Sequence, residues 1–261
     1  MYCFRVLTVL CALCGLAGCG LAGCGRGEDS TETQPPSTTV LDLEDLKTNP
    51  AAYEWFDFRP NLKKLILAGA EDGKHVAILW YTIDNGSVGL HYHGKTESVF
   101  VIDGAQTDAK GTYSTGTIYF NPPGSGHQIS NSTGFFVLAY ASPPDFASTA
   151  LIGEYTPVRV DTSSADFTSA QPFEPLAPGV RAYAAPLDGA GGLSATFFEL
   201  TEPAAAFTYQ GNYLLVLEGS CDVDGATLRK NTLVVAKATL PRAFEVTLPA
   251  GGPCRLLGLS F

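Results

Sequence analysis

Three of the four histidines in this chain lie in one stretch, together with a glutamate. His91 and His93 are two residues apart, so in a strand their side chains leave on the same face. Glu97 follows after a short bend, and His127 follows a Pro-Pro-Gly turn. Imidazole and carboxylate groups suit divalent ions such as Zn, Fe, Mn or Ni. These four residues are therefore candidate ligands for one divalent metal ion, with a coordination position left open for water or a small molecule.

Other residues near this stretch have plainer interpretations. The three histidines could instead be packed core residues that bind no metal. His75 lies in a polar turn, where we expect it to be solvated. Tyr81, Val99, Val101 and Ile129 could line a pocket, although ordinary core packing is the commoner role of such residues.

Short strands must position the candidate ligands. Aromatic and β-branched residues fill short apolar runs between Gly, Asn, Asp and Pro residues, which is typical of strands separated by turns. The runs are 62–67, 76–83, 89–93, 98–102, 111–113, 117–120, 128–131 and 135–140. This number and spacing of strands predict an antiparallel barrel or jelly roll.

The same pattern starts again in the second half of the chain. Residues 216–219 repeat 101–104, and residues 231–235 repeat 116–120, both at an offset of 115 residues. A repeat of this size predicts two copies of one fold in tandem. At that offset Ala206 replaces His91, Thr208 replaces His93, Asn212 replaces Glu97 and Arg242 replaces His127. We therefore expect the second copy to be free of metal.

The first residues have the features of an export signal. Arg5 precedes an apolar run, 6–17, that is too short to span a bilayer. It ends in Leu-Ala-Gly-Cys19, which resembles the lipobox of bacterial lipoproteins, and the same tetrad recurs before Cys24. The resemblance implies cleavage before Cys19 and its acylation, with Cys24 as the second choice and an ordinary cleaved signal as the alternative. We expect a lipid anchor in the bacterial cell envelope, facing the periplasm or the outside.

The net charge bears on possible binding partners, and the cysteines bear on a possible disulfide. The net charge of −10 and the lack of a basic run argue against nucleic acid. Cys221 and Cys254 are the only cysteines outside the N-terminal segment. In an exported protein they could form a disulfide, or they could remain two unpaired buried thiols. The sequence leaves a homodimer open.

Residues 86–131 resemble the two signature motifs of the cupin superfamily. The first motif is carried by His91, His93, Glu97 and Gly104, and the second by Gly116, Pro122, Gly124, His127 and Asn131. One departure occurs in a turn, where Asn85 stands at the place of the leading glycine. The resemblance implies a bicupin with one degenerate half, and it implies that the three histidines and Glu97 are the metal ligands.

A closer resemblance is to the cupin half of the ChrR family, which are zinc-binding anti-sigma factors. It covers about residues 55–140 and, more faintly, 173–261, and it is carried by segments such as His91-Tyr92-His93-Gly94. The helical domain that holds the sigma factor in that family has no counterpart here, so we carry over the fold and the metal site alone. The expected organisation is 1–18 signal peptide, 19–50 tether, 51–141 metal-binding barrel, 142–171 linker and 172–261 degenerate barrel.

Two functions of different classes follow from this pattern. The first is a non-catalytic metal-binding cupin that binds or senses a small molecule in the cell envelope. The second is a metal-dependent enzyme, such as a dioxygenase, an isomerase or a hydrolase, acting on a small organic substrate. An intact ligand set with an open position favours the enzyme, whereas the lack of an obvious acid–base residue beside the ligands favours the binder.

Overall fold

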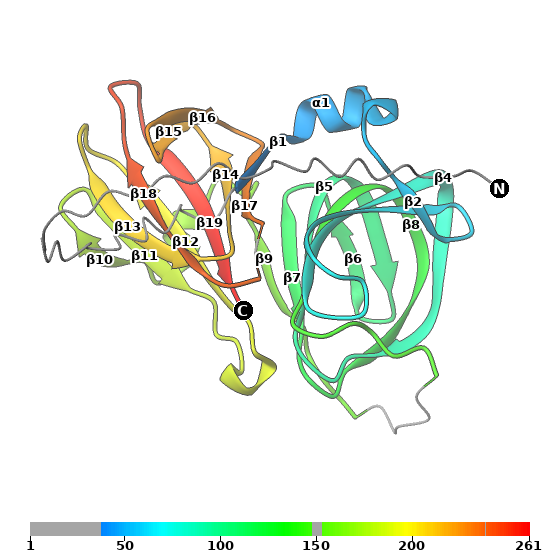
Figure 1. Cartoon of the computed structure of the whole chain (residues 1–261). Helices are drawn as coiled ribbons and strands as arrows, with labels where there is room; N and C mark the ends of the chain where they lie inside the picture. The colour runs from blue at the N-terminus through cyan, green and yellow to red at the C-terminus, as the bar shows by residue number, and fades with distance from the viewer. Residues whose placement is uncertain (1–37, 148–152, 238) are drawn as a thin grey trace, which may run out of the picture. The chain divides into compact units, whose positions relative to one another are not determined.

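Strands dominate the protein, as its composition predicts. The structure is a computed structural model that describes residues 38–147, 153–237 and 239–261. Among these residues the helical segments are short: α1 (Leu43–Thr48), α2 (Phe167–Ala170), η1 (Pro50–Ala52) and η2 (Gly189–Gly191). The all-β class is confirmed (Figure 1). Neither described α-helix has the length and apolar character that a bilayer span requires. The expected signal peptide, Cys19, Cys24 and tether residues up to 37 lie outside the described residues.

The front barrel carries the candidate ligands and is built from one antiparallel sheet. Its strands in spatial order are β2 (Phe56–Arg59), β3 (Leu62–Gly69), β4 (His75–Tyr92), β8 (Gly126–Tyr140), β5 (Glu97–Asp108), β7 (Thr117–Asn121) and β9 (Val158–Asp161), with β6 (Gly111–Ser114) paired to β5. The runs predicted as separate strands at 76–83 and 89–93 form one long strand, β4, and those at 128–131 and 135–140 form β8. Register shifts lie within both long strands.

A pair of glycines bends the front barrel. Gly104 of β5 and Gly134 of β8 are register partners and have positive φ, 82° and 95°. A Cβ on either glycine would lie about 2 Å from a backbone oxygen of the opposite strand, at 2.1 Å for Gly104 and 2.2 Å for Gly134. Only glycine fits such a close approach of two backbones. The bend lets β5 and β8 continue around the barrel instead of ending there.

The rear barrel repeats this plan with two sheets. The larger sheet has the order β1 (Thr38–Asp42), β17 (Thr232–Ala236), β14 (Tyr213–Glu218), β19 (Cys254–Ser260), β12 (Ser194–Leu200), β11 (Val180–Ala184) and β10 (Glu174–Ala177). The smaller sheet has the order β13 (Ala206–Gly211), β18 (Arg242–Thr247), β15 (Ser220–Val223) and β16 (Ala226–Arg229). Strands β16 and β17 lie 115 residues after β6 and β7, so the structure agrees with the offset read from the repeat.

Two segments that we expected outside the barrels belong to sheets, so the tether and linker boundaries need correction. Strand β1 pairs with β17 of the rear barrel, from Thr38↔Ala236 to Asp42↔Thr232. The Asp42 carboxylate then caps α1 by accepting hydrogen bonds from the next turn, and Leu43 and Leu46 are fully buried. In the linker, β9 pairs with β7 of the front barrel. Regular secondary structure in the described residues therefore begins before residue 51.

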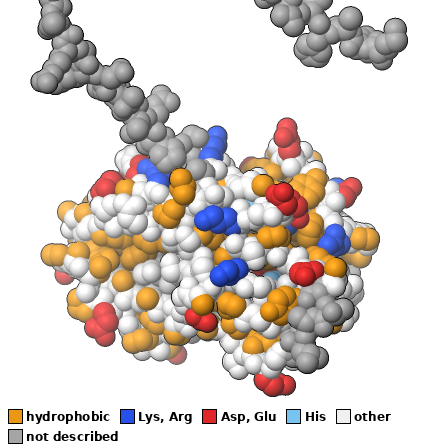
Figure 2. Space-filling model, turned by 60° about the horizontal axis from the view of Figure 1, so that its bottom comes forward, with side chains coloured by type: hydrophobic (Ala, Val, Ile, Leu, Met, Phe, Trp, Pro, Cys, Tyr) orange, Lys and Arg blue, Asp and Glu red, His pale blue; other side chains and the backbone are white. Residues whose placement is uncertain are grey.

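Three hydrophobic clusters account for the core. One contains buried side chains of both barrels, for example Phe120 from the front barrel and Phe197 and Leu257 from the rear barrel. The other two fill the interiors of the rear and front barrels separately. All described residues belong to one compact unit, 35–261. On the face shown in Figure 2, acidic and basic side chains are interspersed with hydrophobic ones.

Candidate metal centre

Strands β4 and β8 bring two candidate ligands side by side. His91 and His127 are register partners, and their rings lie 4.6 Å apart between centroids. The Nδ1 atom of His91 lies 2.9 Å from the Gly89 carbonyl oxygen, which only accepts hydrogen bonds, so this nitrogen is the donor. The Nε2 atom of His91 is therefore the nitrogen with a free lone pair.

The other two candidate ligands flank the turn between β4 and β5. The backbone of His93 is fixed by two hydrogen bonds: its N–H donates to Ser125 O, and its carbonyl accepts from Gly124 N. Glu97 is the first residue of β5, where it pairs with Asn121 of β7 and Tyr140 of β8. The turn that precedes His127 is thus tied directly to the segment that carries His93.

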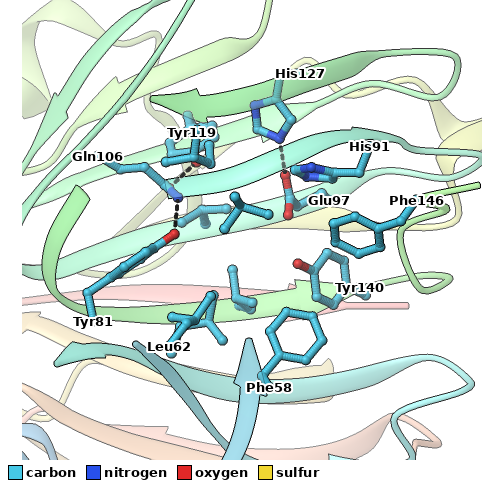
Figure 3. Close-up of a pocket in the computed structure, with 15 residues that line it drawn as sticks. Phe58, Leu62, Tyr81, His91, Glu97, Gln106, Tyr119, His127, Tyr140 and Phe146 are labelled. Carbon is cyan, nitrogen blue, oxygen red and sulfur yellow. Dashed lines mark hydrogen bonds and ion pairs between the residues drawn. The ribbon is translucent and has the colours of Figure 1, made fainter. Parts of the chain in front are cut away.

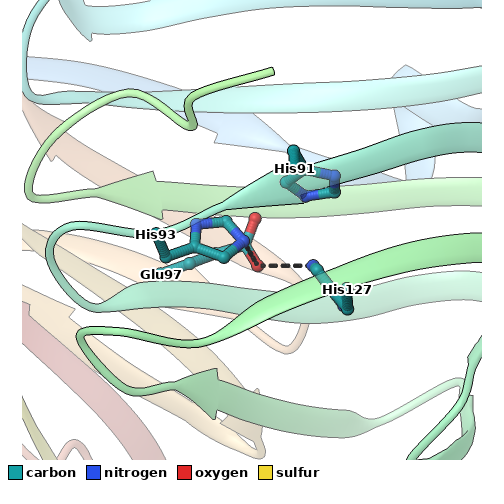
Figure 4. Close-up of side chains that lie close together, drawn as sticks. All are labelled: His91, His93, Glu97 and His127. Atoms are coloured by element: carbon teal, nitrogen blue, oxygen red, sulfur yellow. Dashed lines mark ion pairs between the residues drawn. The ribbon is translucent and has the colours of Figure 1, made fainter. Parts of the chain in front are cut away.

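All four predicted ligands converge on one point inside the front barrel (Figure 4). One ligand atom from each of His91, His93, Glu97 and His127 lies within 4.8 Å of the others, and all four residues are buried. Ligand atoms held about 2.2 Å from a single ion lie at most about 4.4 Å apart, so small side-chain rotations would complete the set. Both ring nitrogens of His93 are buried without a hydrogen-bond partner among the described residues, and Nε2 lies 3.3 Å from a Glu97 oxygen. An ion at the centre would satisfy one of these two nitrogens.

Burial and mutual charge set the protonation of the cluster. Burial lowers the pKa of His91 and lowers that of His93 to about 4. Burial by itself would raise the pKa of Glu97, but the charges of His93, His127 and His91 outweigh it and lower the pKa. His91 and His93 are therefore neutral beside an ionised Glu97 carboxylate, which are the forms in which these groups bind metals.

Two polar residues outside the ligand set hold the ligands in place. Asp108, at the end of β5, accepts a hydrogen bond from His127 Nδ1 at 2.8 Å. Although burial lowers the pKa of His127, hydrogen bonds with Asp108 and Glu97 raise it to about 9. Asn121 donates a hydrogen bond to Glu97 at 2.8 Å. Such outer partners orient metal-binding histidines and carboxylates.

Sequence reasoning missed both of these residues. Asp108 shares the inward face of β5 with Gln106, so strand alternation beyond the bend at Gly104 would have found it. Asn121 follows three apolar residues at the end of its strand, which is a weaker signal.

A narrow cavity opens from the cluster (Figure 3). Its walls include three of the four pocket candidates, Tyr81, Val99 and Ile129, whereas Val101 packs in the core without lining it. Gln106 bridges two phenols in the wall, donating to the Tyr81 hydroxyl at 3.5 Å and accepting from the Tyr119 hydroxyl. The space that the centre of a water molecule could occupy is about 20 Å³, enough for about one water.

Aromatic side chains narrow the mouth of this cavity. The Phe146 ring stacks on the His91 ring with centroids 5.0 Å apart. The Arg59 guanidinium lies 4.6 Å from the Phe58 ring centroid and 4.2 Å from that of Phe146. A two-way backbone bridge between Tyr92 and Asp145 holds the Phe146 segment against β4. Phe146 therefore lies at the edge of the cavity, against one of the candidate ligands.

The prediction for His75 was wrong. Its side chain is fully buried at the start of β4, where Nδ1 donates to the Gly73 carbonyl and Nε2 accepts from the Lys64 ammonium at 3.2 Å. Lys64 is also fully buried and is paired with both oxygens of Glu71. The polar residues before His75 suggested an exposed turn. The burial of His75 depends on Lys64, which lies on the neighbouring strand β3 and is not adjacent in sequence. His75 takes no part in the ligand cluster.

The rear barrel lacks the four metal ligands, as predicted. The residues predicted to replace His91 and His93 at the 115-residue offset were wrong. Gly211 is the register partner of Arg242, as His91 is of His127, so Gly211 and not Ala206 occupies the His91 position. Strand β14 begins at Tyr213, two residues after β13 ends, so the turn that carries His93 has no counterpart, not even Thr208. Arg242 instead pairs with Asp224. Among the described residues, the front-barrel cluster is the one group suited to a metal ion.

The possible disulfide between Cys221 and Cys254 is not formed. Cys221 and Cys254 are free thiols, both fully buried in the hydrophobic cluster of the rear barrel. A hydrogen bond with Cys221, together with burial, raises the pKa of Cys254 far above its ordinary range. Of the two alternatives that the sequence left open, the structure therefore has the unpaired buried thiols.

Comparisons with known proteins agree with this fold. Residues 43–142 match the model of the ChrR cupin-like domain family. Similar solved structures include a putative dioxygenase from Nostoc punctiforme (12% identity, TM-score 0.55, covering 88% of this chain and 85% of that chain). A cupin 2 conserved barrel domain protein from Leptotrichia buccalis has 10% identity and a TM-score of 0.55, covering 88% and 98%. Salicylate 1,2-dioxygenase from Pseudoaminobacter salicylatoxidans has 12% identity and a TM-score of 0.52, covering 88% and 83%. No curated protein matches the sequence.

Proposed function

We propose that the front barrel binds one divalent metal ion, on the premise that residues 43–142 match the ChrR cupin-like domain family and that the chain has a cupin fold. The ligands are His91, His93, Glu97 and His127. The observation that carries the proposal is their convergence, buried and within 4.8 Å of one another, at the end of a cavity. Zn, Fe, Mn and Ni all accept this mixture of imidazole and carboxylate.

The metal, in turn, binds a small molecule without chemical turnover. Four protein ligands leave a position open when the ion takes five or six. The narrow cavity and the Phe146 ring over its mouth restrict that position to a ligand of a few atoms. A narrow cavity of this kind favours binding or sensing over turnover of a bulky substrate.

Metal content tests the ligand set directly. We expect the purified protein to contain about one divalent ion, and His91→Ala or His127→Ala to reduce this close to zero, because each removes a ligand. His75→Gln is the matched control, since His75 is a buried histidine outside the cluster. Elemental analysis that finds the wild-type metal content in His127→Ala would refute the assignment.

The open position can be tested with a small anion. When cobalt-loaded protein is titrated with azide, we expect a saturable change in the visible absorption spectrum. Phe146→Ala should allow imidazole, which is larger, to produce a comparable change. An unchanged spectrum with azide in both proteins would contradict an open coordination position.

A second candidate is a metal-dependent enzyme, such as a dioxygenase, and one observation favours it. The Tyr140 hydroxyl lies in the cavity wall beside Glu97 (Figure 3). Burial, with the charge of Glu97, raises the pKa of Tyr140 well above its usual range, so the phenol keeps its proton. Oxygen uptake by iron-loaded protein in the presence of a small organic acid, lost in His127→Ala and reduced in Tyr140→Phe, would favour the enzyme over the binder.

The site of action that we propose is the bacterial cell envelope, with the chain anchored by lipid on Cys19. The support is the signal-like segment that ends in Leu-Ala-Gly-Cys19. Cys19→Ala should abolish labelling with radioactive fatty acid, and Cys24→Ala should leave it. If Cys19→Ala is still labelled and labelling is lost only when Cys24 is also replaced, the lipid anchor is on Cys24.

A further inference from the structure

The turn that joins two of the candidate ligands is held by a loop of the rear barrel. Thr96, immediately before Glu97, donates its backbone N–H to Gly191 O at 3.0 Å. The neighbouring Lys95 ammonium donates to Ala190 O at 2.9 Å. Both acceptors belong to η2 of the rear barrel. Figure 4 shows that His93 and Glu97 stand at the two ends of this turn.

Gly191 touches the turn too closely for any other residue. A Cβ on Gly191 would lie 1.8 Å from Thr96 Oγ1 and 3.3 Å from Pro123 Cγ. Pro123 belongs to the turn that precedes His127. The φ of Gly191 is outside the positive region, so an alanine could adopt this backbone and only the lack of space excludes it.

Hydrogen bonds from Asp188 fix the conformation of the η2 loop. The Asp188 side chain accepts a hydrogen bond from Ala190 N at 2.9 Å, and the Asp188 carbonyl accepts from Gly191 N at 2.9 Å. The turn of the front barrel is also held on its far side, where Ala141 N donates to Thr96 O at 3.3 Å. A displaced Thr96 therefore cannot move freely, and part of its shift must pass to Glu97.

We propose that the metal-free rear barrel positions the ligands of the front barrel, and that Gly191 is the positioning residue through its contact with Thr96. This inference rests on the proposed metal site. The η2 loop touches the segments that carry His93, Glu97 and His127, and so it sets the spacing of three of the four ligands. A metal site loses affinity when its ligands are displaced even slightly, because the ion fixes their distances.

Cobalt binding by the full chain tests the proposal. We expect Gly191→Ala to bind Co²⁺ about 10 to 100 times more weakly than wild type in chelator competition, as changes around a metal site commonly do. Its visible cobalt spectrum should also change, which a purely structural role for Gly191 would not produce. Gly189→Ala is the matched control in the same loop, because a Cβ there meets nothing within 4 Å.

A second variant guards against misfolding of Gly191→Ala. Thr96 Oγ1 is buried and makes no hydrogen bond with the described residues, so Thr96→Ala removes the clashing atom without removing a hydrogen bond. The Thr96 Cβ would still lie 3.0 Å from the new Cβ, which is tight. We therefore expect Gly191→Ala/Thr96→Ala to recover most of the affinity and the wild-type spectrum.

The outcomes separate the two proposals. Absence of cobalt binding in both wild type and Gly189→Ala would overturn the metal site itself. Wild-type affinity and spectrum in Gly191→Ala would overturn the positioning role alone. A folded double variant that stays as weak as, or weaker than, Gly191→Ala would likewise overturn it, because the loss would not pass through Thr96.

Discussion

The two barrels share a strand plan and differ in what fills them. At the offset of 115 residues, the inward-facing Gln106, Asp108, Tyr119 and Asn121 of the front barrel correspond to Cys221, Val223, Val234 and Ala236 of the rear barrel. The front barrel thus surrounds its ligands with polar groups and a cavity, whereas the rear barrel fills the same space with a continuous hydrophobic cluster. The comparison indicates that the strands alone specify the barrel, and that the polar interior is added to a shell that does not need it.

The turn between the two central strands makes the second difference. In the front barrel four residues separate β4 from β5, and two ligands stand at its ends; in the rear barrel one residue separates β13 from β14. Shortening this turn removes the His93 position altogether. Substitutions alone could therefore not reproduce the four-ligand set of the front barrel in the rear barrel.

The largest expected effect is on the free energy of unfolding, and it tests whether the interior of the rear barrel is tightly packed. Phe244 is fully buried there and packs near Tyr209. Phe244→Ala should lower the free energy of unfolding by about 3–5 kcal/mol, because it leaves a cavity in a packed core. Urea denaturation measures this, with the partly buried Phe207→Ala as the milder control. A loss below that of the control would show that the rear interior is not tightly packed.

A smaller effect tests the polar surroundings of the front site. Asp108→Asn keeps an acceptor for His127 Nδ1 but removes the charge, so metal affinity should fall by about 10 to 100 times. Chelator competition measures the affinity. Asp103→Asn, at an exposed position on the same strand, should leave it unchanged. Equal affinities of the two variants would remove Asp108 from the support of the site.

The smallest effect concerns His75, which forms a buried hydrogen-bonded pair with Lys64 in the front barrel. Burial lowers the pKa of His75 below its usual 6.5, while the Gly73 carbonyl opposes the shift; Lys64, Glu71 and Tyr140 face the ring. Because the unfolded chain binds the proton more readily, His75 stabilises the fold above pH 6.5, and this contribution is lost as pH falls through the lower folded pKa. His75→Gln should therefore flatten the dependence of stability on pH between pH 6.5 and the lower folded pKa of His75, by at most about 1.4 kcal/mol per pH unit. Denaturation of both metal-loaded proteins at several pH values checks it, and parallel curves would contradict the assignment.

The sequence was sufficient for the barrels and the ligand cluster because both depend on local spacing. His91 and His93 alternate along one strand, and the glycines and prolines that end the strands are visible in the chain. Burial of His75 could not be predicted, because it depends on Lys64 from another strand. The alignment of His91 with Ala206 failed because a deleted turn breaks a constant offset and only strand register reveals it. Pairing of β1 with β17 depends on residues nearly two hundred positions apart, for which no local signal exists.

That pairing also constrains the order in which the protein can assemble. Thr38–Asp42 leaves the ribosome long before Thr232–Ala236 and cannot find its place until the rear sheet exists. Contacts between such distant segments form slowly, since the whole intervening loop must first be closed. Until then β17 presents an open edge, to which another strand could add. A chain shortened to begin at residue 51 would keep that edge open permanently, and its aggregation during refolding would be the practical sign of the missing strand.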